Sequence, residues 1–279
     1  MKLSGSRSKS NGACKVIFYM KETIKERTIA GKTFISTRPA GRSDLLRKFF
    51  NAHGAELLEM PMIEIRKAHL SPKETDIVEN SGNFDWIVFT SSNGVVNFFD
   101  HLKDIKGSNE TGIDTRIAVI GENTGSWLSA YGHTAHYVSS GSTGEAFSEE
   151  LRRLMAGKKA SVLLPVGNLA SGIIEERLRG TAEVCRINVY RTEMPSRIDY
   201  EILKIIGEDK YEMVIFTSGS GVNNFCRAAA GRIDLHSLRI ACIGTTTAGA
   251  LEAKGIKPLV TATEMSSGGI AGAILDYYM

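Results

Sequence analysis

The chain carries one segment twice, and this repeat limits the possible folds more than any other feature. FDWIVFTSSNGVVNFF spans residues 84–99, and YEMVIFTSGSGVNNFC spans residues 211–226. Each copy has a short apolar run followed at once by Thr, Ser and Gly, which predicts a buried strand that turns directly into a helix. Such a turn points backbone N–H groups with partial positive charge at the ligand-binding edge of an open α/β sheet. The repeat therefore favours an anionic ligand.

The elements around the repeat recur in the same order roughly 120 to 130 residues later, the size of a small domain. Strands are predicted at residues 33–36, 55–65, 87–89, 116–121, 136–138, 160–164, 182–190, 214–216 and 239–244. Helices are predicted at residues 43–52, 71–81, 94–102, 122–131, 142–155, 169–178, 247–254 and 266–278. This alternation predicts an α/β protein with two similar, doubly wound, flavodoxin-like domains of parallel sheet covered on both faces.

Two strand-like segments, residues 56–67 and 183–195, carry charge along their length. Central strands of a parallel sheet are apolar throughout, so these segments fit exposed, paired linkers better. We therefore expect a two-stranded connection between the domains.

Composition excludes several classes of function. At 279 residues, the chain fits two domains of typical size. No apolar run approaches the roughly 20 residues of a membrane helix, so we expect no membrane span. The net charge is +3 and is spread without a basic block, so nucleic acid is not an expected partner.

The four cysteines are scattered, and the six histidines form no HxxxH pattern. We expect reduced thiols in a cytoplasmic protein, and no metal site. Residues 1–31 fit none of the repeated elements and are expected to form a flexible N-terminal extension. The glycine patterns of nucleotide-binding loops are missing, so no nucleotide cofactor is expected.

Seven short motifs, in this order, resemble the uroporphyrinogen-III synthase family. They are Thr37-Arg38-Pro39, Phe89-Thr90-Ser91-Ser92-Asn93-Gly94, Ala118-Val119-Ile120-Gly121, Leu164-Pro165-Val166-Gly167-Asn168, Val189-Tyr190-Arg191-Thr192, Phe216-Thr217-Ser218-Gly219-Ser220-Gly221 and Ile243-Gly244-Thr245-Thr246-Thr247-Ala248. Each alone is a generic strand end. The resemblance covers the chain from about residue 32 to its end.

The resemblance implies a crossed-over architecture. One domain would comprise residues 32–63 and 196–279, the other residues 67–187, and residues 64–66 and 188–195 would be linker strands. It also implies a cofactor-independent lyase that converts the linear tetrapyrrole hydroxymethylbilane to uroporphyrinogen III. The reaction expels a terminal hydroxyl as water, inverts ring D and closes the macrocycle, in the cleft between the two domains. Positioning should supply most of the advantage over spontaneous closure, which gives the uninverted isomer.

Tyr190 matches the family's cleft tyrosine and is the candidate catalytic residue. A phenol is a hydrogen-bond donor at neutral pH, so Tyr190 can donate to the departing hydroxyl. The other interpretation is a tyrosine that only packs at the hinge.

Eleven residues are candidates to bind the substrate's carboxylates through hydroxyls, backbone amides or guanidinium groups. They are Arg38, Thr90, Ser91, Ser92, Asn93, Thr217, Ser218, Ser220, Arg239, Thr246 and Thr247. The serines and Thr247 can equally serve as helix caps, and Arg239 can be a solvated strand end. Some relatives carry arginine where Asn93 stands, so a cationic contact is absent from that turn.

The main alternative is a two-domain α/β binding protein that closes on an anionic small molecule without chemistry, because fold alone does not exclude it. A nucleotide-using transferase is a second alternative, which the missing glycine fingerprints oppose. Nothing in the sequence indicates an obligate oligomer, and a monomer is expected.

Overall fold

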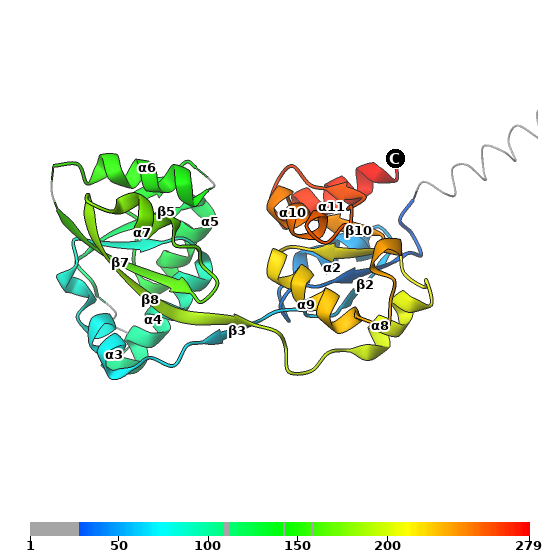
Figure 1. The fold of residues 1–279 in the computed structure, drawn as a ribbon, viewed down its shortest axis with the longest axis horizontal. Coiled ribbons are helices and arrows are strands. Elements are labelled where there is room, and N and C mark those ends of the chain that lie inside the picture. Colours follow the sequence, from blue (N-terminus) through cyan, green and yellow to red (C-terminus); the bar gives the residue numbers. More distant parts are fainter. Residues whose placement is uncertain (1–27, 109–111, 142, 158) are drawn as a thin grey trace, which may run out of the picture. The chain divides into compact units, whose positions relative to one another are not determined.

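The structure is a computed structural model that describes residues 28–108, 112–141, 143–157 and 159–279. These residues form two compact units, unit 1 from residues 28–64 and 194–279 and unit 2 from residues 65–193. The chain therefore passes between the units twice (Figure 1). Most of the expected N-terminal extension, with Cys14, falls outside the described residues. Residues 28–31 belong to unit 1, because Ile29 is buried in its core.

Unit 1 is built on a five-stranded sheet in the order β11-β10-β9-β1-β2. Its strands are β1 (Thr33–Ser36), β2 (Glu56–Glu59), β9 (Met213–Phe216), β10 (Ile240–Cys242) and β11 (Val260–Thr261). All neighbouring strands are parallel. Counted along the chain, the order is that of the doubly wound flavodoxin-like fold.

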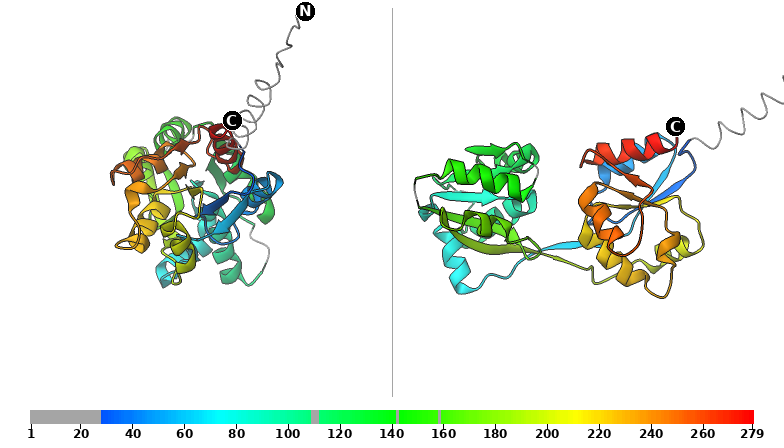
Figure 2. Two further views of the ribbon diagram at one scale, coloured as in Figure 1. Left: turned by 90° about the vertical axis from the view of Figure 1, so that its right-hand side faces the viewer. Right: turned by 45° about the horizontal axis from the view of Figure 1, so that its top comes forward.

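Helices cover both faces of this sheet (Figure 2). Side chains of α8 (Tyr200–Gly207), α9 (Gly219–Ala229) and α10 (Thr245–Glu252) pack on one face, and those of α2 (Asp44–Ala52) and α11 (Ser267–Tyr277) on the other. A short 3-10 helix spans Leu235–Ser237. Successive β1 residues Phe34 and Ile35 enter opposite cores, and both are fully buried. This two-sided burial explains why the central strands are apolar throughout.

Unit 2 is built on a six-stranded sheet in the order β3-β8-β7-β4-β5-β6. The strands are β3 (Glu64–Lys67), β4 (Trp86–Phe89), β5 (Arg116–Ile120), β6 (Tyr137–Ser139), β7 (Ala160–Gly167) and β8 (Ala182–Glu193). The helical segments are α3 (Pro72–Glu79), a 3-10 turn at Ser81–Asn83, α4 (Ser92–Lys106), α5 (Gly121–Ser126), a 3-10 turn at Trp127–Tyr131, α6 (Gly144–Leu154) and α7 (Ile173–Leu178). Side chains of α3 and α4 pack on one face, and those of α6 and α7 on the other.

Several boundaries differ from the predictions, and three of them have a clear physical reason. The predicted strand 55–65 is interrupted between β2 and β3, where Pro61 has no N–H to donate to a ladder. Helix α4 continues beyond residue 102 and ends at Gly107, whose φ of 64° suits the left-handed C-terminal cap. The predicted helix 169–178 begins only at Ile173, because residues 168–169 form a turn and residues 170–172 are not helical.

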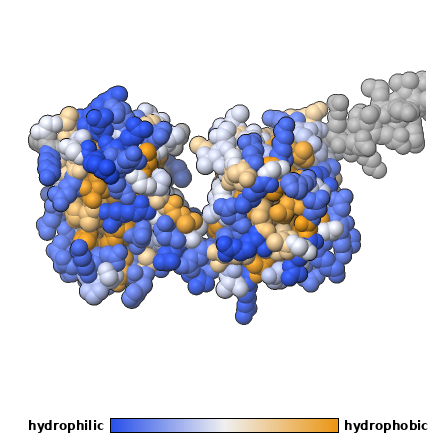
Figure 3. All heavy atoms as spheres, viewed as in Figure 1, coloured by the Kyte–Doolittle hydropathy of each residue, from blue (hydrophilic) through white to orange (hydrophobic). Residues whose placement is uncertain are grey.

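The surface of the viewed face is mainly hydrophilic, with small apolar patches on either unit (Figure 3). Among the described residues, no helix combines the length and apolar character needed to cross a membrane.

Candidate active site

In unit 2 the candidate site begins at the N-terminus of α4, directly after β4. Ser91 is the N-cap, and its Oγ accepts a hydrogen bond from the Gly94 N–H at 3.1 Å. The Ser91 carbonyl accepts from the Val95 N–H at 3.2 Å. The amides of Ser92 and Asn93 have no partner within the helix, as is general for first-turn residues. They carry the positive end of the helix dipole and suit a carboxylate.

Tyr190, on β8, reaches this helix end. Its hydroxyl lies 3.3 Å from the Ser91 Oγ, and its side chain is half-buried. The two side chains come from segments that do not pair, since β7 lies between β8, which carries the phenol, and β4, which precedes the serine. Ser91 thus has two functions, because one oxygen caps α4 and also contacts the only tyrosine among the predicted site residues. The arrangement presents a proton donor beside two amides that can hold an anion.

Unit 1 repeats the helix end without the tyrosine. Ser218 follows β9, and its Oγ accepts from the Gly221 N–H at 3.1 Å. The Ser218 Oγ also lies 3.2 Å from the Ser220 Oγ. The backbone angles of Ser91 (φ −160°, ψ 153°) and Ser218 (φ −160°, ψ 151°) are nearly identical. The two copies of the sequence repeat therefore build the same helix end.

Helix α10 provides a second N-terminus at the same edge of the unit 1 sheet. Its N-cap is Gly244, which supplies no side-chain cap. Thr246 is exposed, whereas Thr247 is buried and faces the unit's interior. Thr246 is thus available to a ligand, and Thr247 is a structural residue in this arrangement.

Arg38 lies at the turn after β1 and belongs to this edge as well. Its Nη1 donates to the Ser267 Oγ at 2.6 Å, at the beginning of α11. Burial, and to a lesser extent the neighbouring Arg42 cation, lowers the pKa of Arg38. Because two guanidinium groups lie near each other beside helix N-termini, a bound carboxylate would relieve their repulsion.

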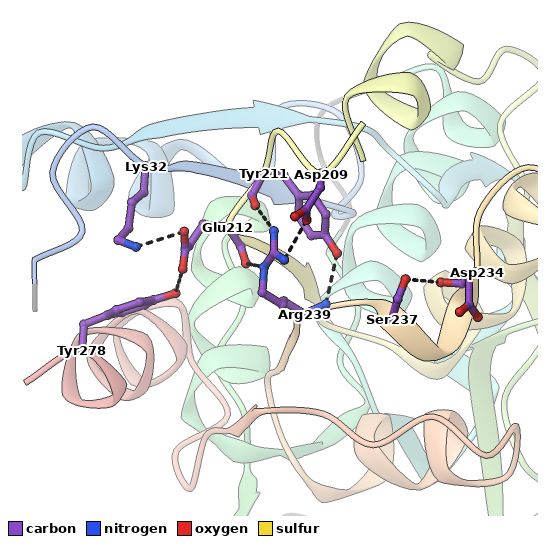
Figure 4. A network of polar contacts seen from close by, with 8 residues as sticks. All are labelled: Lys32, Asp209, Tyr211, Glu212, Asp234, Ser237, Arg239 and Tyr278. Atoms are coloured by element: carbon purple, nitrogen blue, oxygen red, sulfur yellow. Dashed lines mark hydrogen bonds and ion pairs between the residues drawn. The ribbon is translucent and has the colours of Figure 1, made fainter. Parts of the chain in front are cut away.

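Arg239 does not join these residues, which corrects the sequence-based grouping. It precedes β10 and therefore lies at the amino edge of the sheet, whereas the serines follow their strands at the carboxyl edge. Figure 4 shows its guanidinium among backbone and side-chain partners. Nε donates to the Glu212 carbonyl at 2.9 Å, Nη2 donates to the Tyr211 carbonyl, and Nη1 lies 2.7 Å from Asp209. These contacts are structural.

The remaining predicted residues lie at the two helix ends. Thr90 and Thr217 directly follow β4 and β9 and are half-buried, and Ser92 is the first residue of α4. The Asn93 carbonyl accepts from the Asn97 Nδ2 at 2.8 Å.

Sequence reasoning missed residues that surround Tyr190. Gly167 and Asn168 occur in a quoted motif, but no role was predicted for them. Asn168 N–H donates to the Tyr190 carbonyl at 3.2 Å, and its Oδ1 accepts from the Thr192 N–H at 2.8 Å. Gly167 is the last residue of β7 and Asn168 directly follows it, and this place at a strand end was the only available signal.

Together, the parallel sheet of each unit and the equivalent helix ends define a class: doubly wound α/β proteins in two units, with capped helix N-termini at the carboxyl edges of their strands. Comparison with known proteins narrows the class. The family model for uroporphyrinogen-III synthase HemD matches residues 44–271. The chain therefore belongs to the uroporphyrinogen-III synthase family, which confirms the resemblance of the seven motifs and makes the protein a cyclising lyase of tetrapyrrole biosynthesis.

Individual relatives agree with this assignment. The chain is 30% identical over 235 residues to a uroporphyrinogen-III synthase of Chlorobaculum parvum, covering 81% of this chain and 91% of the relative. It is 28% identical over 229 residues to that of Synechococcus elongatus, covering 81% and 86%.

Solved structures confirm the fold. A mutant uroporphyrinogen III synthase from the extremely thermophilic bacterium Thermus thermophilus superposes with a TM-score of 0.59 at 17% identity, covering 88% of this chain and 98% of that one. The enzyme from Helicobacter pylori gives 0.58 at 18% identity, covering 88% and 99%. The predicted two-domain α/β class with parallel sheets is thereby confirmed.

Proposed function

We propose that this protein converts hydroxymethylbilane to uroporphyrinogen III without a cofactor, with Tyr190 as the proton donor. The observation that carries the proposal is the contact between the Tyr190 hydroxyl and Ser91, the N-cap of α4. It places a phenol beside helix amides that can bind one of the substrate's carboxylates.

Substrate binding is assigned to the capped helix ends. The amides of Ser92 and Asn93 in unit 2, and those of Gly219 and Ser220 in unit 1, lie in first helical turns and lack intrahelical partners. Each end has a partial positive charge, which attracts acetate and propionate groups. Thr90, Thr217 and Thr246 would add hydroxyl donors, and Arg38 would add a guanidinium.

Loss of the hydroxyl is the step assigned to Tyr190. The phenol gives its proton to the terminal hydroxyl, the C–O bond breaks, and water leaves a cationic azafulvene. The negative charge left on the phenolic oxygen lies at the N-terminus of α4, whose dipole stabilises it. Ring closure releases a proton, which restores the phenol. Tyr190 thus ends the cycle protonated, and the proposed reaction uses no metal or cofactor.

The test is to supply freshly prepared hydroxymethylbilane to the purified protein without cofactor and to separate the oxidised products by isomer. We expect the type III isomer at a rate proportional to protein concentration. Exclusive formation of the spontaneous type I isomer by a folded protein would contradict the proposal and support a binding protein without chemistry.

Replacing Tyr190 with Phe tests the proton donor, because it removes the hydroxyl and keeps the ring. General acid catalysis typically contributes about 10²-fold or more, so we expect kcat to fall by about that factor with KM changed little. Steady-state rates of type III formation provide the measurement. A Tyr190→Phe variant with full kcat would show that Tyr190 is not the acid.

We also propose that the enzyme is a monomer of the cytoplasm. The described cysteines Cys185, Cys226 and Cys242 are free, and burial raises the pKa of each thiol, which suits a reducing compartment. Light scattering after gel filtration should give the mass of one chain, and the mass of a dimer would contradict the proposed monomer.

A further inference from the structure

The bulge opposite Tyr190 is the starting point. Strands β7 and β8 pair in parallel from Ala160 onward, with Val166 opposite Asn188 and then Gly167 opposite Tyr190. Val189 is therefore an extra residue on β8. Bulges of this kind redirect the next side chain and occur often beside active sites. Here the redirected side chain is Tyr190.

Gly167 faces the redirected ring so closely that a residue with a Cβ would force the ring to move. A Cβ added to Gly167 would lie 2.5 Å from Cε2 and Cζ of Tyr190 and 2.9 Å from its hydroxyl oxygen. The three nearest atoms all belong to Tyr190. Gly167 is not among the glycines with positive φ, so its backbone conformation is open to any residue. With the ring in this position, only glycine fits at position 167, and the Tyr190 ring is the reason.

The backbone at Gly167 is fixed from both sides and cannot move away easily. Arg186 Nη2 donates to the carbonyls of Gly167 at 3.3 Å and Ala170 at 2.9 Å. Arg186 Nη1 is paired with Glu175 at 2.9 Å. Asn168 also bonds to β8, as described above. A new side chain at position 167 would therefore displace the half-buried ring of Tyr190, which has more freedom than the turn.

We propose that Gly167 is a positioning residue for the reaction: its bare backbone lets the Tyr190 ring lie against the end of β7, which sets the phenol beside Ser91. This inference rests on the proposed role of Tyr190. The contact between the hydroxyl and Ser91 is 3.3 Å, so a small displacement separates the two oxygens. Misplacement of a reacting group by about 1 Å can cost about 10²-fold in rate.

The first experiment compares Gly167→Ala with Gly82→Ala. Gly82 is an exposed glycine of the same unit, without positive φ, and nothing lies within 4 Å of its added Cβ. We expect Gly167→Ala to lower kcat for type III formation by at least about tenfold with KM within about twofold. Gly82→Ala should match the parent. A Gly167→Ala variant with parental kcat would overturn the proposal.

The second experiment repeats Gly167→Ala in the Tyr190→Phe background. If Gly167 acts through the hydroxyl, the alanine should change the residual kcat by less than about twofold there. An equal loss in both backgrounds would overturn the positioning role while leaving Tyr190 as the acid. Full activity of Tyr190→Phe alone would instead remove the catalytic role of Tyr190, and this inference with it.

If Gly167→Ala folds poorly, a stability measurement tests the proposal in place of the kinetics. Both tryptophans, Trp86 and Trp127, belong to unit 2, so their fluorescence reports its unfolding in urea. Gly167→Ala should lower the urea midpoint when Tyr or Phe occupies position 190, and much less in a Tyr190→Ala background that has no ring. An equal drop in all backgrounds would show that the ring is not what requires glycine, which contradicts the proposal.

Discussion

Ser91 and Ser218 show how one sequence motif serves two functions. Both cap their helices with the same geometry, but only Ser91 contacts a tyrosine. Ser218 contacts another serine, Ser220. Under the proposed function, both helix ends would bind carboxylates, and Tyr190 on β8 would add the chemistry at the unit 2 end. The proposed function therefore places the chemistry in unit 2 and carboxylate binding alone in unit 1.

This asymmetry predicts different kinetics for two matched variants. Ser91→Ala and Ser218→Ala each remove one cap, which typically costs about 1 kcal/mol of stability. Ser91→Ala should lower kcat, because the phenol loses its partner. Ser218→Ala should raise KM and leave kcat nearly unchanged. Steady-state assays of type III formation at saturating and limiting substrate separate the two effects, and identical kinetic profiles would contradict the assignment.

At the scale of elements, helix α4 contacts β8 through a side chain on its body, in addition to the contact at its N-terminus. The buried His101 on α4 bonds through Nε2 to the Val189 carbonyl at 3.1 Å, next to Tyr190. The Ala68 N–H, just after β3, donates to the same carbonyl at 3.1 Å. Burial, followed by the Lys67 cation, lowers the pKa of His101 below its ordinary 6.5. The folded unit therefore favours the neutral imidazole.

This pKa shift predicts that unit 2 loses stability in mild acid. Below about pH 6.5 the unfolded chain binds a proton at His101 that the folded state resists, so stability falls with pH until the lower folded pKa is reached. Urea midpoints from tryptophan fluorescence should therefore drop between about pH 7.5 and about pH 5.5. The drop should be smaller in His101→Gln, which keeps an N–H donor but does not titrate. Equal drops in the parent and in His101→Gln would show that another group causes the loss of stability in acid.

The sequence predicted the elements better than their mutual contacts. The central strands were recognisable because burial on both faces makes them apolar, as Phe34 and Ile35 illustrate. Ser91 and Ser218 were recognisable because caps are local. The contact between Gly167 and Tyr190 was not, since it depends on a bulge in the pairing of two strands. Arg239 was grouped with the site residues through the family resemblance, although its place just before β10 puts it at the amino edge of the sheet.

At the scale of the whole molecule, the chain builds one unit without interruption and the other from two separated parts. Unit 2 is continuous from residue 65 to 193, whereas unit 1 combines residues 28–64 with 194–279. The two parts of unit 1 are joined in the centre of its sheet, where β1 pairs with β2 on one side and β9 on the other. Neither part contains a complete sheet.

We therefore predict that an isolated fragment of residues 65–193 folds on its own. It contains all strands and both cores of unit 2, so it should show a cooperative urea transition in tryptophan fluorescence with a midpoint close to that of the full chain. The fragment 28–64, as a control, should give the far-ultraviolet circular dichroism of an unfolded peptide. A gradual, non-cooperative transition of fragment 65–193 would contradict the prediction.

The central position of β1 has a consequence for synthesis of the protein. Phe34 and its strand are translated before unit 2, but their partner β9 is translated only after the whole of unit 2. At about 5 to 20 residues per second, this delay is on the order of 10 s. During that time unit 2 can already fold, while β1 and β2 expose apolar side chains and an unpaired edge. We therefore expect chaperones to bind β1 and β2 during synthesis.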